Sequence, residues 1–156
     1  MQITALQIDE AAEICRWRYE GEYAFYNLEE CQETISELLD GTYYGVRNAE
    51  NEFIGFCCFG ANAQVPSGRR AGVYGGDHVV DIGLGMKPEL TGQGSGMAFL
   101  SACLGFARET FEPQRLRLSV AAFNGRAIRL YAKAGFEPSG RFDNNGTEFL
   151  VMERNA

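Results

Sequence analysis

Glycine is concentrated where the chain could hold a phosphate group. The chain has 19 glycines among 156 residues, about 12%, against roughly 7% in ordinary proteins. Gly92, Gly94 and Gly96 separate an apolar run that ends at Met86 from an amphipathic run that begins at Met97. A strand, a glycine loop and a helix N-terminus in this order direct backbone N–H groups and the positive end of a helix dipole toward one point. This arrangement suits a phosphate or pyrophosphate, and a purely structural turn is the alternative.

The spacing of the loop excludes two common phosphate-binding motifs. A Walker A loop requires Lys-Ser or Lys-Thr at its end, and neither follows Gly96. The Rossmann fingerprint has the spacing GxGxxG, whereas this loop reads GxGxG, and no β-α-β unit opens the chain.

Two segments resemble the GCN5-related N-acetyltransferase (GNAT) superfamily. The acyl-CoA loop of that family has the pattern Pro-x-x-(Arg/Gln)-Gly-x-Gly-x-(Gly/Ala), which Pro88–Gly96 matches except at Thr91. A later pattern, Asn-x-x-Ala-x-x-x-Tyr-x-Lys-x-Gly-Phe, is matched by Asn124, Ala127, Tyr131, Lys133, Gly135 and Phe136. Two linked motifs in this order are far more specific than either motif alone.

The resemblance implies an acetyl-CoA site. In similar proteins, Leu84, Gly85 and Met86 offer backbone groups to the pantetheine arm and the thioester carbonyl, with the Met86 N–H as oxyanion donor. The pyrophosphate would be held by Thr91, Gly92, Gln93, Gly94, Ser95, Gly96 and Met97. Asn124 would contact the pantetheine, and the Tyr131 hydroxyl would protonate the departing thiolate. Tyrosine suits that step because its pKa of about 10 exceeds the thiol value of about 8.5.

Three of the polar side chains also have structural interpretations. Tyr131 can be a packing residue of an amphipathic helix, and Asn124 can cap the helix that begins at Gly125. Asp81 lies in an apolar run, so it either lies at a strand mouth in water or acts as a general base with a raised pKa. Residues 119–123 hold no carboxylate, although the branch that acetylates peptide N-termini has one there. The base is therefore supplied from elsewhere in the chain or is a water.

Aromatic and acidic side chains are dense near the N-terminus. This group contains Trp17, Tyr19, Glu22, Tyr23 and Tyr26. One interpretation is a core beneath the first helices. In similar proteins this region covers the acceptor pocket, where aromatic faces and carboxylates suit a cation.

Composition limits the remaining function classes. The net charge of −7 disfavours a nucleic-acid partner, and no apolar run is long enough for a membrane helix. The chain has five cysteines without CxxC spacing and one histidine, so we expect no metal site. The first residues lack a signal-peptide pattern, which favours a cytoplasmic protein. The last two strands could form a homodimer interface.

The expected fold is a single α+β domain over residues 1–156, a mixed central sheet flanked by helices in the order β-α-α-β-β-β-α-β-α-β-β. The expected strands are Met1–Ile8, Tyr43–Arg47, Phe53–Phe59, Val79–Met86, Arg115–Val120, Phe136–Phe142 and Thr147–Met152. The expected helices are Asp9–Arg18, with Asp9 as a possible N-cap, Leu28–Leu39, Met97–Phe111 and Gly125–Ala134. Ala61–Gly76 reads as a loop, and Asn145-Gly146 as a hairpin turn.

These observations predict an N-acetyltransferase that moves acetyl from acetyl-CoA to a primary amine by direct attack through a tetrahedral intermediate. The acceptor would be a small molecule, or alternatively a protein N-terminus or lysine side chain. A second alternative is a non-catalytic acyl-CoA-binding module. Thr91 and the missing carboxylate favour the module, whereas the intact Tyr131 favours the enzyme.

Overall fold

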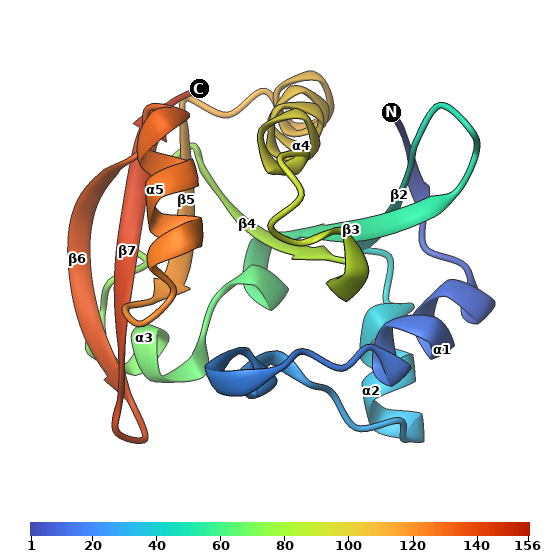
Figure 1. The fold of residues 1–156 in the computed structure, drawn as a ribbon. Coiled ribbons are helices and arrows are strands. Elements are labelled where there is room, and N and C mark those ends of the chain that lie inside the picture. Colours follow the sequence, from blue (N-terminus) through green and yellow to red (C-terminus); the bar gives the residue numbers. More distant parts are fainter. The chain divides into compact units, whose positions relative to one another are not determined.

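The computed structural model describes residues 1–156 as an α+β fold, as the sequence predicts (Figure 1). The strands are β1 (Gln2–Ala5), β2 (Tyr43–Arg47), β3 (Phe53–Phe59), β4 (Val79–Met86), β5 (Arg115–Ala121), β6 (Glu137–Asn144) and β7 (Thr147–Asn155). The α-helices are α1 (Ile8–Arg16), α2 (Gln32–Leu38), α3 (Pro66–Ala71), α4 (Gly96–Phe111) and α5 (Gly125–Lys133). Three short 3-10 helices are η1 (Gly21–Tyr26), η2 (Gly60–Ala63) and η3 (Pro88–Leu90).

The sheet is mixed, as expected. Its strand order is β1-β2-β3-β4-β5-β7-β6. Strands β4 and β5 pair in parallel, whereas the pairs β1–β2, β2–β3, β5–β7 and β6–β7 are antiparallel.

The chain divides into two compact units. The first comprises residues 1–58 and 84–102, and the second comprises residues 59–83 and 103–156. Strand β4 therefore contributes its start to the second unit and Leu84–Met86 to the first. The single domain over residues 1–156 stays a prediction.

In the first unit, α1 begins earlier than the sequence predicts. The Gln7 N–H donates to the Glu10 carboxylate over 2.9 Å, so the N-cap is Gln7, and the prediction of Asp9 was wrong. Asp9 and Glu10 instead occupy the first turn, where negative charge favours the positive end of the helix dipole. The first strand is correspondingly shorter and ends at Ala5.

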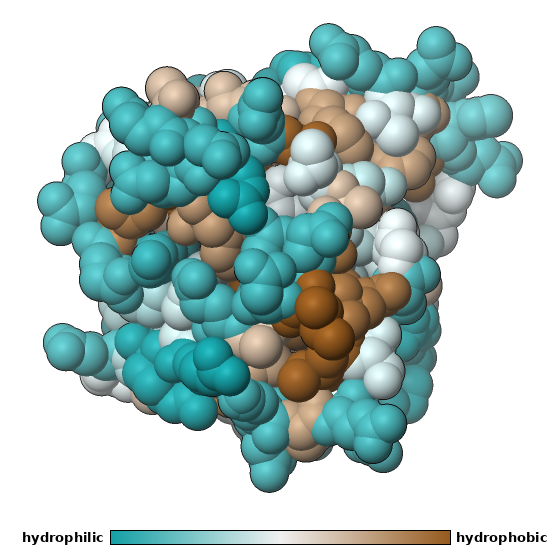
Figure 2. All heavy atoms as spheres, turned by 90° about the vertical axis from the view of Figure 1, so that its right-hand side faces the viewer, coloured by the Kyte–Doolittle hydropathy of each residue, from teal (hydrophilic) through white to brown (hydrophobic).

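The second predicted helix is also shorter than expected. It begins at Gln32 rather than Leu28, and Leu28 is exposed. Ile8 and Leu39, at the start of α1 and just after α2, are exposed as well. Figure 2, which shows the side that carries α1 and α2, has a hydrophobic patch surrounded by hydrophilic side chains. Some apolar residues at the ends of these helices therefore stay exposed.

In the second unit, the β6–β7 hairpin confirms the Asn-Gly turn. Asn145 and Gly146 both have positive φ, 50° and 91°, which this two-residue turn type requires. Helix α5 begins at an N-cap, since the Asn124 side chain accepts the Ala127 N–H over 3.2 Å. Gly135 follows the helix with φ 93°. The capping interpretation of Asn124 is confirmed.

The segment Ala61–Gly76, which we expected to be a loop, contains η2 and α3. Pro66 lies in the first turn of α3, where its missing N–H costs nothing. Gly72 ends the helix in the left-handed conformation, with φ 76°. The helix is only six residues long, too short to show helical periodicity in the sequence.

Candidate functional site

The peptide that ends β4 is held from two sides. The Lys87 N–H donates to the Ile54 carbonyl of β3 over 2.8 Å. Because the C=O and N–H of a trans peptide point in opposite directions, the Met86 carbonyl points away from β3. There the Tyr19 hydroxyl donates to it over 2.7 Å. The Met86 side chain lies near the start of α4, with its sulfur 4.0 Å from the Ser95 hydroxyl.

Two glycines allow the close packing of this strand end within the first unit. A Cβ at Gly85 would lie 2.1 Å from the Phe56 ring. A Cβ at Gly55 would lie 2.6 Å both from the Gly85 carbonyl oxygen and from the Phe99 ring. Both distances are far below a van der Waals contact, so neither position accommodates a side chain without displacement of its neighbours.

The glycine loop lies open to solvent. Gly92, Gln93 and Gly94 are exposed, and Gly92 and Gly94 have φ 72° and 84°. A Cβ at Gly94 would meet no atom within 4 Å, so this glycine is required by its conformation and not by space. The Thr91 hydroxyl donates to the Pro88 carbonyl over 2.7 Å, so its proton is used to close η3.

Helix α4 begins with unpaired backbone donors beside this loop. The Phe99 N–H donates to the Ser95 carbonyl over 3.1 Å. The N–H groups of Gly96, Met97 and Ala98 precede this bond and so have no acceptor within the helix. Together with the dipole of a 16-residue helix, they suit an anion.

The aromatic residues of the N-terminal segment separate into a core group and a half-buried group. Trp17 is buried, and its ring stacks on Phe53 and Phe56 at 5.6 and 6.2 Å between centroids. Trp17 therefore packs in the core, which is one of the two interpretations of this aromatic group. Tyr19 and Tyr26 are half-buried and meet edge to face at 6.4 Å.

The two other predicted acceptor residues lie in η1. Tyr23 is half-buried and Glu22 is exposed. Phe25, which the sequence analysis did not select, lies between them and Tyr26, is exposed, and contacts the Tyr26 ring edge to face at 5.4 Å.

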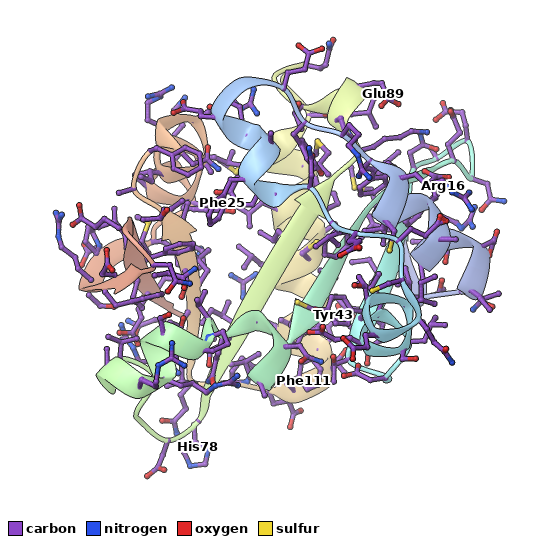
Figure 3. All side chains as sticks on the ribbon, turned by 90° about the horizontal axis from the view of Figure 1, so that it is seen from below. Arg16, Phe25, Tyr43, His78, Glu89 and Phe111 are labelled. Carbon is purple, nitrogen blue, oxygen red and sulfur yellow. The ribbon has the colours of Figure 1, made fainter.

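Carboxylates lie around the end of β4. The Lys87 ammonium lies 3.8 Å from both the Glu13 and the Glu89 carboxylates. Glu13 also accepts the Trp17 indole N–H over 3.1 Å. Burial, with a smaller contribution from the negative charge of Glu89, raises the pKa of Tyr19 to about 12. Figure 3 shows Glu89 on η3, next to the end of β4. Glu13, Lys87 and Glu89 were not predicted from the sequence, because their proximity depends on the fold.

Asp81 does not lie at a strand mouth in water. It is 3% exposed, and its two oxygens accept from Arg117 over 2.6 and 2.9 Å. The Gln64 amide donates to the same carboxylate over 2.8 Å. Arg117, itself 3% exposed, donates also to the Tyr74 and Gly75 carbonyls. Its hydrogen bond to Asp81 raises the pKa of the Arg117 guanidinium, which therefore stays charged.

Arg117 was not predicted from the sequence as a partner of Asp81. A signal was present, because Asp81 and Arg117 are opposite charges placed inside two segments that were both expected to be strands. The parallel register pairs these two residues directly.

Tyr131 and Asn124 belong to the second unit. Tyr131 is half-buried, and its ring lies 6.2 Å from that of Phe136. The Phe136 N–H donates to the Tyr131 carbonyl over 3.0 Å, which fixes the turn after α5. The predicted acid role of Tyr131 and the predicted pantetheine contact of Asn124 stay predictions.

The structure shows neither a metal-ligand cluster nor a membrane-spanning helix. No group of three or more His, Cys, Asp or Glu side chains is placed to hold a metal ion. None of the helices combines the length and apolar character needed to cross a bilayer.

Comparison with known proteins gives a consistent result. Residues 8–136 match the family described as Acetyltransferase (GNAT) family. Two curated relatives from Bacillus subtilis, a probable spermine N(1)-acetyltransferase (subspecies natto) and a spermine/spermidine N(1)-acetyltransferase (strain 168), are each 28% identical over 81% of this chain and 76% of their own length.

Solved structures show the same fold. A chimera of the Vibrio cholerae spermidine N-acetyltransferase SpeG and hSSAT has a TM-score of 0.71, with 18% identity over 99% of this chain and 96% of its own. A point mutant of the Vibrio enzyme has a TM-score of 0.70, with 17% identity over 99% of this chain and 95% of its own.

Proposed function

Because the chain belongs to the acetyltransferase (GNAT) family, we propose that it transfers acetyl from acetyl-CoA to a primary amino group of a polyamine such as spermidine or spermine. The observation that carries this proposal is the match of 81% of the chain to two relatives that are both named for spermine acetylation. We further propose that residues 1–156 act as one acetyltransferase domain, since β4 runs through both compact units.

The distribution of charge supports a cationic acceptor. Residues 9–40 contain ten acidic and two basic side chains, a net charge of −8, while the whole chain carries −7. The acidic excess of the protein is thus confined to the segment that holds the predicted acceptor residues. Glu13 and Glu89 bring two of the carboxylates of the first unit to the end of β4, where they already hold the ammonium of Lys87. A polyamine presents several ammonium groups of the same kind.

The backbone at the end of β4 and the glycine loop fit acetyl-CoA. The backbone of Leu84, Gly85 and Met86 would receive the pantetheine arm and the thioester carbonyl. The exposed loop and the three free donors of α4 would hold the pyrophosphate. Thr91 replaces the Arg or Gln of the family pattern, and its hydroxyl carries no positive charge. Backbone N–H groups would therefore supply most of the hydrogen bonds to the pyrophosphate.

The chemistry then follows from the groups available. A neutral amine attacks the thioester carbonyl, the resulting oxyanion accepts a hydrogen bond from the Met86 N–H, and the tetrahedral intermediate collapses. The departing thiolate receives its proton from the Tyr131 hydroxyl. We no longer propose Asp81 as the base, because both of its oxygens are committed to Arg117. Water would accept the proton of the amine.

The test is a product screen followed by one variant. The chain is incubated with acetyl-CoA and, separately, with spermidine, spermine, butylamine, a peptide with a free N-terminus and a lysine peptide, and products are identified by mass spectrometry. Acetylated spermidine or spermine is the expected product. Acetylation of the peptides alone would reassign the acceptor, and binding of acetyl-CoA with no product from any amine would favour the non-catalytic module.

The variant Tyr131→Phe tests the acid. It should lower kcat about 100-fold, the lower range for loss of a general acid, while the Kd for acetyl-CoA changes little. Tyr44→Phe, a half-buried tyrosine of β2, is the matched control and should retain the parent rate. Turnover of Tyr131→Phe at the parent rate would show that the acid assignment is wrong.

A further inference from the structure

Four contacts of the first unit converge on the end of β4. The Met86 carbonyl accepts from the Tyr19 hydroxyl, and the next peptide N–H, that of Lys87, donates to Ile54. The Met86 sulfur lies near the Ser95 hydroxyl, and Gly85 leaves no free space next to Phe56. Tyr19 is the only one of these partners that lies outside the sheet and the α4 region, 67 residues before Met86.

The geometry of a strand determines where the Met86 N–H points. In an extended strand the N–H and C=O of one residue point to the same edge, which is why paired residues exchange both bonds. The Met86 carbonyl points away from β3, since the Lys87 N–H of the same peptide points toward β3. The Met86 N–H therefore lies on the edge where the Tyr19 hydroxyl lies.

We propose that Tyr19 is a positioning residue for acetyl transfer: its hydroxyl fixes the Met86 backbone so that the Met86 N–H is aimed at the thioester carbonyl. The proposal deepens the proposed function and rests on its assignment of Met86 as the oxyanion donor. It also replaces the direct contact with the acceptor that the sequence predicted for Tyr19.

Tyr19 is itself well anchored for this role. Its backbone N–H donates to the Asn27 side chain over 2.7 Å, and its ring meets Tyr26 edge to face. Burial keeps its pKa near 12, so the hydroxyl retains the proton that it donates at every pH where the enzyme would work. A rigid, permanently protonated donor is what a fixed backbone orientation requires.

Loss of this hydroxyl leaves the strand in place but frees its end. In Tyr19→Phe the Lys87 N–H still donates to Ile54, so β4 stays attached to β3. The Met86 carbonyl loses its partner, and rotation of the backbone at Met86 changes the aim of its N–H. Misalignment of a catalytic group by a fraction of an ångström is enough to slow a reaction, because a shift of about 1 Å can cost about 100-fold.

Infrared difference spectroscopy tests directly whether the Met86 N–H points at the thioester carbonyl. Acetyl-CoA labelled with ¹³C at the thioester carbonyl is bound to the parent chain and to Tyr19→Phe without any acceptor. A hydrogen bond to the carbonyl lowers its stretching frequency, so the parent should show a lowered band and Tyr19→Phe a band closer to that of free acetyl-CoA. The Kd for acetyl-CoA, from calorimetry, should agree within about threefold. With spermidine as acceptor, kcat should fall about 10- to 100-fold while the KM for acetyl-CoA is unchanged.

Two further variants complete the experiment. Tyr43→Phe removes a buried tyrosine hydroxyl elsewhere in the first unit and should leave the carbonyl band where the parent has it. Asn27→Ala, which keeps the Tyr19 hydroxyl but releases its backbone, should shift the band in the same direction as Tyr19→Phe by a smaller amount, and it serves if Tyr19→Phe does not fold.

The outcomes separate this proposal from the proposed function. A parent-like carbonyl band in both Tyr19→Phe and Asn27→Ala would overturn the positioning role, even if kcat fell. The spectrum needs no acceptor, so a failure to acetylate polyamines would overturn the proposed substrate and leave this result valid. A parent chain that does not bind acetyl-CoA would overturn both.

Discussion

The two ends of β4 are held by different kinds of interaction. Near its start, Asp81 and Arg117 are each 3% exposed and form a two-point ion pair, which Gln64 and two backbone carbonyls complete. At its end, the carbonyl of the half-buried Met86 accepts only a neutral hydroxyl, and an exposed glycine loop follows within a few residues. The difference indicates that the start of the strand contributes stability, whereas the end leaves backbone groups accessible, as the proposed acetyl-CoA site requires.

The largest expected effect is at the start of the strand. Asp81→Asn leaves the Arg117 charge buried without its partner, and such a loss costs about 3–5 kcal/mol in free energy of unfolding. Urea denaturation measures the change. At urea concentrations below the unfolding transition, the Kd of Asp81→Asn for acetyl-CoA should stay within about threefold of the parent value.

Two controls sharpen this result. Glu148→Gln breaks an exposed pair with Arg141 and should cost less than about 1 kcal/mol. Adding Arg117→Met to Asp81→Asn removes the unpaired charge and should restore part of the stability. A loss of acetyl-CoA affinity as large as the loss of stability would contradict the division between the two ends.

Next in size is the effect of added volume at the end of β4. Gly85→Ala places a methyl group 2.1 Å from the Phe56 ring and should cost about 1–3 kcal/mol in free energy of unfolding. Phe56→Leu in the same chain should recover part of that loss, because the obstacle is a side chain. Gly55→Ala instead meets the Gly85 carbonyl and the Phe99 ring, so Phe56→Leu should not rescue it. Equal rescue of both variants would argue against this packing.

A smaller stability effect should come with a selective loss of ligand. Gly94→Ala forces alanine to φ 84° and should cost about 1–2 kcal/mol in free energy of unfolding. Gly146→Ala, at φ 91° in the β6–β7 turn, should cost about the same. Only Gly94→Ala should weaken acetyl-CoA binding, about tenfold in calorimetry, because it tilts N–H groups whose bonds to a charged phosphate are worth about 1.5–3 kcal/mol each. Equal affinities of the two variants would remove the loop from the site.

The smallest effect is a pH dependence of stability. The raised pKa of Tyr19, about 12 in the folded chain against 10.0 ordinarily, means that the unfolded chain loses this proton first. The stabilisation is therefore complete below pH 10 and is lost as the pH rises from 10 to 12. Over that range the parent should lose more stability than Tyr19→Phe in urea titrations. Burial also raises the pKa of Tyr43, but Tyr43 is present in both chains, so its contribution to the difference in stability cancels. Parallel curves would mean that the Tyr19 hydroxyl is not buried.

Local sequence patterns predicted the elements that begin or end at residues with clear turn or helix-capping preferences. The Asn145-Gly146 hairpin and the limits of α5 follow from residues whose backbone preferences are known. The family motifs located the glycine loop between strand and helix, which the fold confirms. Short α3 was missed, although Pro66 and Gly72 mark its two ends, because no apolar periodicity accompanies them.

Contacts between residues distant in sequence could not be predicted in the same way. Asp81 read as a possible base because nothing local shows that Arg117, 36 residues later, is paired with it. Tyr19 was predicted to lie at the acceptor site because the residues around it are aromatic and acidic, and nothing local shows that its hydroxyl donates to a backbone carbonyl 67 residues away. Both facts depend on the register and packing of strands, which residue types alone do not specify.

The charge of residues 9–40 also has a kinetic consequence. An acidic segment attracts a multiply charged cation before contact is made, and this attraction raises association rates at low ionic strength. At about 0.15 M salt the Debye length is about 8 Å, so the attraction acts mainly over about that distance from the acidic surface. The association rate of a polyamine should therefore fall steeply with added salt, whereas that of a neutral amine should hardly change.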